Sequence, residues 1–164
     1  MIRARWLPAV LALILLSACA AGEAGTEGPV LWFCAGQEED HGPALAVQPY
    51  EGEVKPETLL NALLAGPTQE GLYSPFPWGV TLRQCKWDEE RPGILLVDLS
   101  EQYGALADVS LSLADYAVVL TLSQVEGVEG VEITTGGRRV SYRSHQTLNV
   151  QEAVLWDELA DTIS

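Results

Sequence analysis

Cationic side chains are scarce in this chain: 9 lysines and arginines stand against 23 aspartates and glutamates, which gives a formal net charge of −14 at pH 7. A surface this acidic repels the phosphates of nucleic acids and the anionic head groups of lipids, so we expect no nucleic-acid partner. It would tolerate a cationic partner or a cloud of divalent ions. The same excess of acids is also what solubility beside a negatively charged envelope requires.

Groups suited to catalysis are equally few. The two histidines, His41 and His145, lie in polar stretches typical of loops. No serine lies in a nucleophile-elbow motif, and no glycine-rich stretch has the spacing that binds phosphate. The acidic run Glu38–His41 has carboxylates that suit calcium, but it lacks EF-hand spacing and is better explained as a solvated loop. The sequence therefore predicts that the protein is not an enzyme and has no metal site and no cofactor.

One acid stands apart from the others. Asp98 lies at the end of the apolar run Ile94–Leu99, immediately before Ser100. An isolated acid there could be a buried functional carboxylate, but an acid at the end of a strand more often caps the turn that follows. We therefore expect Asp98 to cap that turn.

Apolar runs long enough to span a membrane are also missing. The N-terminal run Trp6–Leu16 covers about 11 residues and is interrupted by Pro8, whereas a spanning helix needs about 20. Arg3 and Arg5 precede this run and small residues follow it, which is typical of an export signal.

The end of this signal resembles the lipobox of bacterial lipoproteins, in the sequence Leu16-Ser17-Ala18-Cys19. The resemblance implies that residues 1–18 are a signal peptide and that the thiol of Cys19 carries lipid. It also implies an extracytoplasmic protein anchored to the cell membrane. An ordinary secretory signal or an uncleaved anchor is the alternative. Cleavage removes two arginines and no acid, so the net charge becomes −16.

Three segments follow the signal peptide. Residues 19–29 are rich in glycine and alanine, and we expect them to form a flexible tether. Residues 30–145 have the length of one domain with a hydrophobic core, and we expect residues 146–164 to form a C-terminal helical tail. With Cys19 lipidated, Cys34 and Cys85 remain. Two cysteines in an exported domain suggest a disulfide, but both lie in apolar runs where a free cysteine packs as a small hydrophobe, so the sequence leaves their bonding open.

Hydrophobic periodicity and turn residues predict alternating strands and helices. The expected elements are a hairpin of Val30–Cys34 and Leu45–Tyr50, a helix over Pro56–Ala65, an irregular stretch Gly66–Gly79, a hairpin of Val80–Trp87 and Ile94–Leu99, a helix over Ser112–Val125, a strand Gly130–Thr134 with Arg138–Arg143 pairing back, and a short helix from Asn149.

The two longer helices define the expected core. Ser112 and Asp115 fit a capping box at the start of the second helix. The inward residues would be Leu60, Leu63 and Leu64 from the first helix and Leu113, Ala117 and Leu120 from the second. This order predicts an α+β fold in which both amphipathic helices cover one face of a mainly antiparallel sheet, with a short C-terminal helix added.

Four segments in this order resemble the GerMN domain of sporulation and spore-germination lipoproteins. They are Leu59–Pro67, Gly71–Val80, Leu96–Ser100 and Val119–Gly137. Together they cover about residues 30–140. The resemblance implies a domain of the ring-building type. It also implies a role in protein–protein assembly or self-assembly outside the cell membrane, in sporulation or germination, without catalysis.

The proline-rich loop is the best candidate for a recognition surface, through Tyr73, Phe76 and Trp78. Its prolines lower the entropy cost of binding, and its aromatic rings offer contact area. The alternative is an ordered loop that packs its own aromatics. Trp32 and Trp87 lie in expected strands and should belong to the core. Binding of cell-wall glycan or a small ligand is the second hypothesis for function.

The lipid anchor can be tested by replacing Cys19 with alanine. We expect the Cys19→Ala variant to leave the membrane fraction or to accumulate unprocessed, because the acylated thiol is lost. Labelling cells with a radioactive fatty acid measures this. A wild-type protein that stays membrane-bound without taking up label would show that residue 19 is not lipidated.

Overall fold

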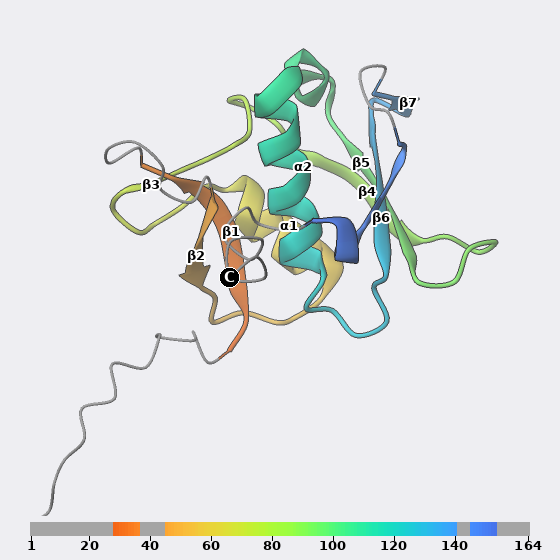
Figure 1. The fold of residues 1–164 in the computed structure, drawn as a ribbon, viewed down its shortest axis with the longest axis horizontal. Coiled ribbons are helices and arrows are strands. Elements are labelled where there is room, and N and C mark those ends of the chain that lie inside the picture. The colour runs from red at the N-terminus through yellow and green to blue at the C-terminus, as the bar shows by residue number, and fades with distance from the viewer. Residues whose placement is uncertain (1–27, 37–44, 141–144, 154–164) are drawn as a thin grey trace, which may run out of the picture.

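The computed structural model describes residues 28–36, 45–140 and 145–153, and it confirms an α+β fold with two α-helices in that part of the chain (Figure 1). In chain order the elements are β1 Val30–Ala35, β2 Leu45–Pro49, α1 Pro56–Leu64, β3 Leu72–Tyr73, β4 Leu82–Trp87, β5 Ile94–Leu99, the 3-10 helix η1 Glu101–Ala105, α2 Asp108–Leu122, β6 Gly130–Thr135, β7 Arg138–Arg139, β8 Thr147–Asn149 and the 3-10 helix η2 Val150–Glu152.

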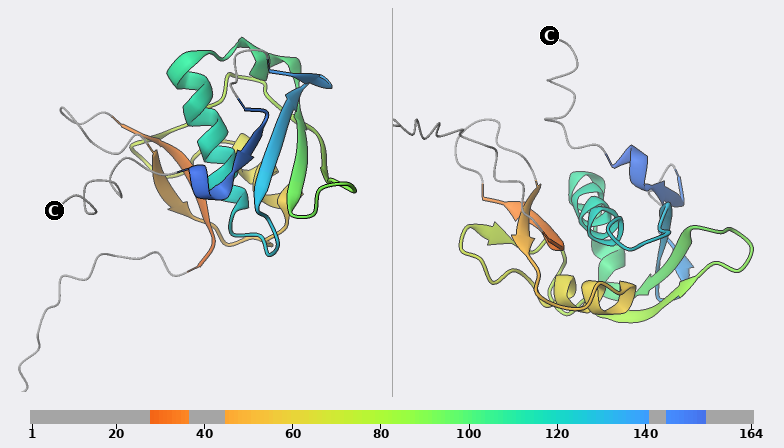
Figure 2. Two further views of the ribbon diagram at one scale, coloured as in Figure 1. Left: turned by 45° about the vertical axis from the view of Figure 1, so that its right-hand side comes forward. Right: turned by 90° about the horizontal axis from the view of Figure 1, so that it is seen from below.

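The strands form two sheets with the helices between them (Figure 2). The smaller sheet has the order β2-β1-β3, and the larger has the order β4-β5-β6-β7 with β8 also paired to β6. α2 contacts β1 on one side and β6 and β8 on the other, while α1 contacts β1 and β4. Both helices therefore cover one face of the larger sheet, as expected. The expectation of a single sheet is wrong, because the first hairpin lies on the opposite side of the helices.

The larger sheet is mixed. β5 and β6 run parallel, with Val97 opposite Ile133, whereas β4 pairs with β5 in the antiparallel sense. Parallel neighbours need a long crossover, and η1 with α2 supplies it. The crossover places α2 against the inner face of the sheet, where Leu95, Val97 and Leu99 are buried.

One edge of β1 is completed by side chains from the end of α2 and from the turn that follows it. β3 pairs only with Cys34 and Ala35, so the first half of β1 has no strand on that side. The amide of Val30 donates to Oε1 of Gln124 at 2.8 Å, and Nε2 of Gln124 donates back to the Val30 carbonyl. The amide of Trp32 donates to Oγ1 of Thr121 at 3.1 Å. These bonds satisfy strand groups that would otherwise be unpaired.

The first helix agrees with its prediction. Pro56 opens α1, where its missing N–H costs nothing, and Glu57 lies near the positive end of the helix dipole. Leu60 and Leu63 are fully buried, whereas Leu64 is only partly buried. The chain leaves the helix through Gly66, whose φ of +90° suits glycine.

The second helix begins four residues earlier than predicted, at Asp108, and has no capping box at Ser112. Asp115 is instead buried inside the helix, where it accepts a hydrogen bond from the Tyr103 hydroxyl. The expected core face is only partly right, because Ala117 is buried whereas Leu113 and Leu120 are half-buried. The buried side chains include Leu111, Ala114, Ala117, Val118, Val119 and Leu122. A helix covered by sheets on two sides is apolar around most of its surface, so periodicity does not identify one face.

Smaller differences concern short elements. β3 lies in the stretch that was expected to be irregular, and β8 has no counterpart among the expected strands. The turn after Asn149 is a 3-10 helix as far as the structure describes it, and residues 154–164 lie outside the described part. Of the expected return strand Arg138–Arg143, the structure shows β7 paired with β6. None of the described helices has the length and hydropathy to span a bilayer.

The core can be tested with three leucines. Leu63→Ala and Leu122→Ala should each lower the free energy of unfolding by about 2 to 5 kcal/mol, because both side chains are fully buried between the layers. Leu120→Ala is the matched control and should cost clearly less, since its side chain is partly exposed. Urea denaturation measures all three. An equal loss at Leu120 and Leu122 would contradict this orientation of α2.

Candidate functional site

The proline-rich loop between β3 and β4 presents one tryptophan almost wholly to solvent. Trp78 is 98% exposed and Tyr73 is 61% exposed. Phe76 does not belong to this surface, because it is buried and its ring packs on Tyr103 with a centroid distance of 6.2 Å. Phe76 therefore anchors the loop to the core. The exposed aromatic surface is therefore Tyr73 and Trp78.

Hydrogen bonds brace the loop on both sides of Trp78. The Phe76 amide donates to Oγ of Ser74 at 3.2 Å, and the Val80 amide donates to the Pro77 carbonyl at 3.3 Å. Gly79 takes a φ of +83°, which closes this turn at little cost for glycine. The loop is thus ordered by its own contacts, and none of them uses the Trp78 ring.

The two tryptophans that lie in strands differ in their exposure. Trp32 is half-buried and packs against the core. Trp87 is 45% exposed, so the expectation that it belongs to the core is wrong. It lies at the end of β4, near the turn at Gly127, where the helices no longer cover it.

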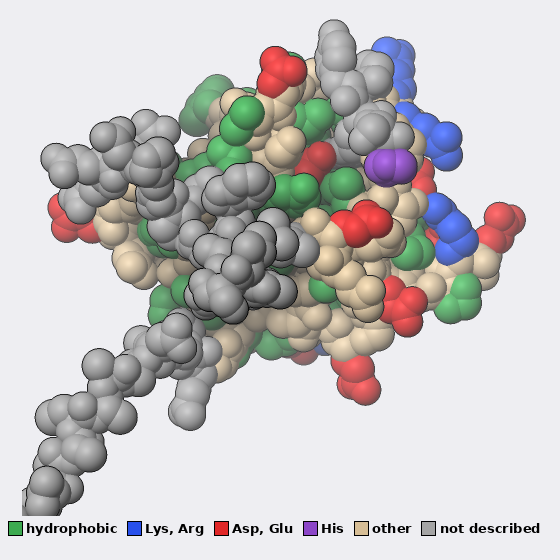
Figure 3. All heavy atoms as spheres, in the orientation of Figure 1, with side chains coloured by type: hydrophobic (Ala, Val, Ile, Leu, Met, Phe, Trp, Pro, Cys, Tyr) green, Lys and Arg blue, Asp and Glu red, His purple; other side chains and the backbone are tan. Residues whose placement is uncertain are grey.

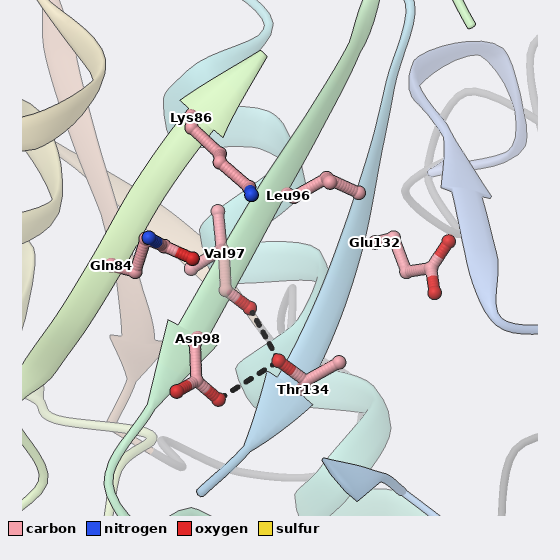
Figure 4. A pocket seen from close by; sticks show the side chains of 7 residues that line it. All are labelled: Gln84, Lys86, Leu96, Val97, Asp98, Glu132 and Thr134. Carbon is pink, nitrogen blue, oxygen red and sulfur yellow. Dashed lines mark hydrogen bonds between the residues drawn. The ribbon is translucent and has the colours of Figure 1, made fainter. Parts of the chain in front are cut away.

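A shallow groove of about 160 Å³ crosses the face of the larger sheet that points away from the helices (Figure 4). It is lined by Gln84, Lys86, Leu96, Val97, Asp98, Glu132 and Thr134. Leu96 lies opposite both Lys86 and Glu132, and Asp98 lies opposite Gln84 and Thr134. Of these residues only Asp98 was singled out from the sequence, and the groove itself was not predicted. Polar residues lie at alternate positions of the three strands, but only the register of the strands shows that they face one another.

Asp98 lies in this groove and fastens three strands together. Its carboxylate accepts hydrogen bonds from Oγ1 of Thr134 and from the Gly137 amide, both at 2.8 Å, and from Nε of Arg83 at 3.0 Å. The expected cap on the turn after its own strand is therefore wrong, because Asp98 holds the turn between β6 and β7. Burial raises the pKa of this carboxyl, but the three hydrogen bonds outweigh it and leave the pKa below its usual value.

A second carboxylate in the groove is bound by arginines. Glu132 accepts a hydrogen bond from Nη2 of Arg91 at 2.7 Å, and Nε of Arg139 lies 3.6 Å from it. Arg91 also binds Asp88 and donates to the Thr147 hydroxyl at 3.1 Å, so it ties the turn between β4 and β5 to β8. These contacts hold the outer strands together.

Cys34 and Cys85, whose bonding the sequence leaves open, are free thiols on separate sheets. Burial raises the pKa of both, and for Cys85 the nearby charge of Glu57 adds to it and brings the pKa to about 12. Both therefore stay protonated at neutral pH and are poor nucleophiles. His145 is exposed, and His41 and Cys19 lie outside the described residues. In the described part of the chain, no three His, Cys, Asp or Glu side chains are grouped to hold a metal ion.

The comparisons with known proteins concern both the sequence and the fold. Residues 33–141 match the family model described as "Germane: Sporulation and spore germination". The fold is similar to the tandem GerMN domains of the sporulation protein GerM from Bacillus subtilis, with a TM-score of 0.59 and 15% identity over 77% of this chain and 47% of that one. It is also similar to the first GerMN domain of that protein alone, with a TM-score of 0.57 and 15% identity over 74% and 96%. The chain thus spans about half the length of the tandem structure. No curated protein matches it in sequence.

The role of Asp98 can be tested through the pH dependence of stability. Because its pKa is lowered in the folded state, its contribution is present above about pH 3.9 and is lost as the pH falls through the folded value. Asp98→Asn should cost about 1 to 3 kcal/mol of unfolding free energy at pH 7, and the difference from wild type should shrink below pH 4. Urea melts from pH 3 to pH 7 measure this. A difference independent of pH would contradict a charged, structural Asp98.

Proposed function

The chain belongs to the Germane family of sporulation and spore germination, and on that premise we propose that it is a lipid-anchored, non-catalytic protein-interaction module on the extracytoplasmic face of the cell membrane. The lipobox at Cys19 supports the anchor and the location. The GerM-like fold supports a role as a module, since it is the fold of a sporulation protein. Partner proteins or further copies of the chain would be its ligands.

The side-chain chemistry of the described residues supports a role without catalysis. Asp98 is occupied by three hydrogen bonds and Glu132 by arginines, so neither carboxylate is available as a general base. Both free cysteines have raised pKa values. A site for acid–base or nucleophilic chemistry needs such groups free and close to each other.

The observation that carries the proposal is the exposure of Trp78. A tryptophan that is 98% exposed contributes almost nothing to the core, yet a braced loop holds its backbone in place. Such an aromatic side chain loses little entropy when a partner covers it, and tryptophan is enriched among the residues that dominate protein interfaces. Trp78 is thus suited to anchor a protein partner.

Cell-wall glycan is the second candidate ligand. Two exposed aromatic rings, Tyr73 and Trp78, could stack on the faces of sugar rings. Binding to purified peptidoglycan that requires Trp78 would favour this alternative over a protein partner.

We expect a photo-crosslinking residue placed at position 78 of the full lipoprotein in its own cells to yield a discrete protein adduct, because a partner covers this position. The same residue at position 87, which is also exposed, is the matched control and should yield none. Trp78→Ala should change the unfolding free energy by less than about 0.5 kcal/mol, since the ring is in solvent. Equal adducts at both positions, or a strongly destabilised Trp78→Ala, would contradict the proposal.

A further inference from the structure

The cations of this acidic protein are concentrated on one side. Six lysines and arginines lie in the described part of the chain, and of these only Lys55, at the start of α1, lies outside the strands and turns of the larger sheet. The others are Arg83, Lys86, Arg91, Arg138 and Arg139, on β4, on β7 and in the turn before β5. Figure 3 shows blue side chains along the side of the molecule that carries β7, whereas red ones are scattered over the visible face.

The acids and cations of this side lie at different depths. The side chain of Asp98 is 16% exposed, whereas its partner Arg83 is 55% exposed. Glu132 is 9% exposed, whereas Arg91 is 46% and Arg139 is 71% exposed. The carboxylates therefore form the floor of the groove and the guanidinium groups form its rim. In each of these ion pairs the cation is the more exposed partner, although Glu89 and Glu90 in the turn beside Arg91 are also exposed.

Two groups in the groove remain available to a ligand. Lys86 is exposed and extends from β4 across the groove (Figure 4), and it makes no ion pair with any described residue. The side-chain amide of Gln84 likewise has no hydrogen bond within the described part. Arg83 uses only Nε on Asp98, and the contact of Arg139 with Glu132 is long at 3.6 Å. Their terminal N–H groups are left to bind an external carboxylate.

The arrangement favours a polypeptide over a phosphate polymer. The rim cations exceed the floor acids by only a small number, and the rest of the chain is strongly acidic, so a dense polyanion would be repelled. In contrast, Gln84 and Lys86 are two residues apart on a strand, a spacing of about 7 Å. An extended peptide presents alternate side chains at the same spacing, so its acids can reach the rim while its polar groups meet the floor.

We propose that the outer face of β4, β5 and β6 is a docking surface for an acidic segment of a partner protein. Carboxylates of that segment pair with Lys86, Arg83 and Arg139, and its neutral positions lie over Leu96 between them. Leu96 is the partly buried apolar residue at the centre of the groove. This surface goes beyond the proposed function, because it uses neither the lipid anchor nor Trp78.

The test uses the full lipoprotein in detergent and a synthetic twelve-residue peptide with glutamate at every fourth position and neutral polar residues between, so that glutamates and neutral residues alternate on the face that meets the sheet. Titration at low salt should show saturable binding, with NMR shifts of the Gln84, Lys86 and Thr134 amides. Lys86→Gln should weaken binding about threefold, and Lys86→Gln combined with Arg139→Gln about tenfold, as expected for exposed ion pairs. Both side chains are exposed, so the variants should melt like the wild type.

Lys55→Gln removes the same charge at the start of α1, which packs on the inner face of the sheet, and should weaken binding less than 1.5-fold, as should Trp78→Ala. Equal losses from Lys55→Gln and Lys86→Gln would reduce the effect to net charge and overturn the proposal. It would also fail if the glutamate peptide does not bind, or if a peptide with glutamine in place of glutamate binds equally. Inorganic polyphosphate that binds more tightly than the peptide, and depends on Lys86, would assign the surface to phosphate instead.

Discussion

The position of α2 between the two sheets is the constraint on which the rest of the structure depends. The helix covers the inner face of the larger sheet because it belongs to the crossover between parallel β5 and β6. Its opposite side packs on β1, and Thr121 and Gln124 complete the open edge of that strand. An isolated hairpin is only marginally stable in water, and β3 adds just two residues to the hairpin of β1 and β2. The smaller sheet, and the loop that leaves β3, therefore depend on this helix for their place.

Local sequence patterns predicted the elements better than their arrangement. Pro56, the following leucines and Gly66 mark α1 by signals that act within a few residues, and this helix was predicted almost to its ends. The pairing of β5 with β6 was missed, because it depends on contacts between residues more than 30 positions apart. The start of α2 was missed for a different reason. Ser112 and Asp115 fit a capping box, but burial of Asp115 beneath the Tyr103 hydroxyl prevailed over that local preference.

The same distinction applies to the two candidate surfaces. The sequence left open whether the proline-rich loop offers its aromatics for recognition or packs them. The structure shows both, because Trp78 is exposed whereas Phe76 packs on Tyr103. The groove could not be predicted, since its residues come from three strands and converge only through their register. Asp98 illustrates why. Its three hydrogen-bond donors lie on β4, on β6 and in the turn that follows β6, and none of them is near it in sequence.

Net charge and local charge act on this protein at different distances. The excess of acids sets the long-range field, which salt screens within about 8 Å at physiological ionic strength. At contact distance the outer sheet presents guanidinium and ammonium groups, because the carboxylates that orient them lie beneath. The carboxylates of Asp98 and Glu132 would repel an acidic partner if they were exposed. Because they lie beneath the cations, they instead hold in place the groups that attract such a partner. An acidic domain can therefore repel polyanions in general and still offer one cationic face to a segment that fits it.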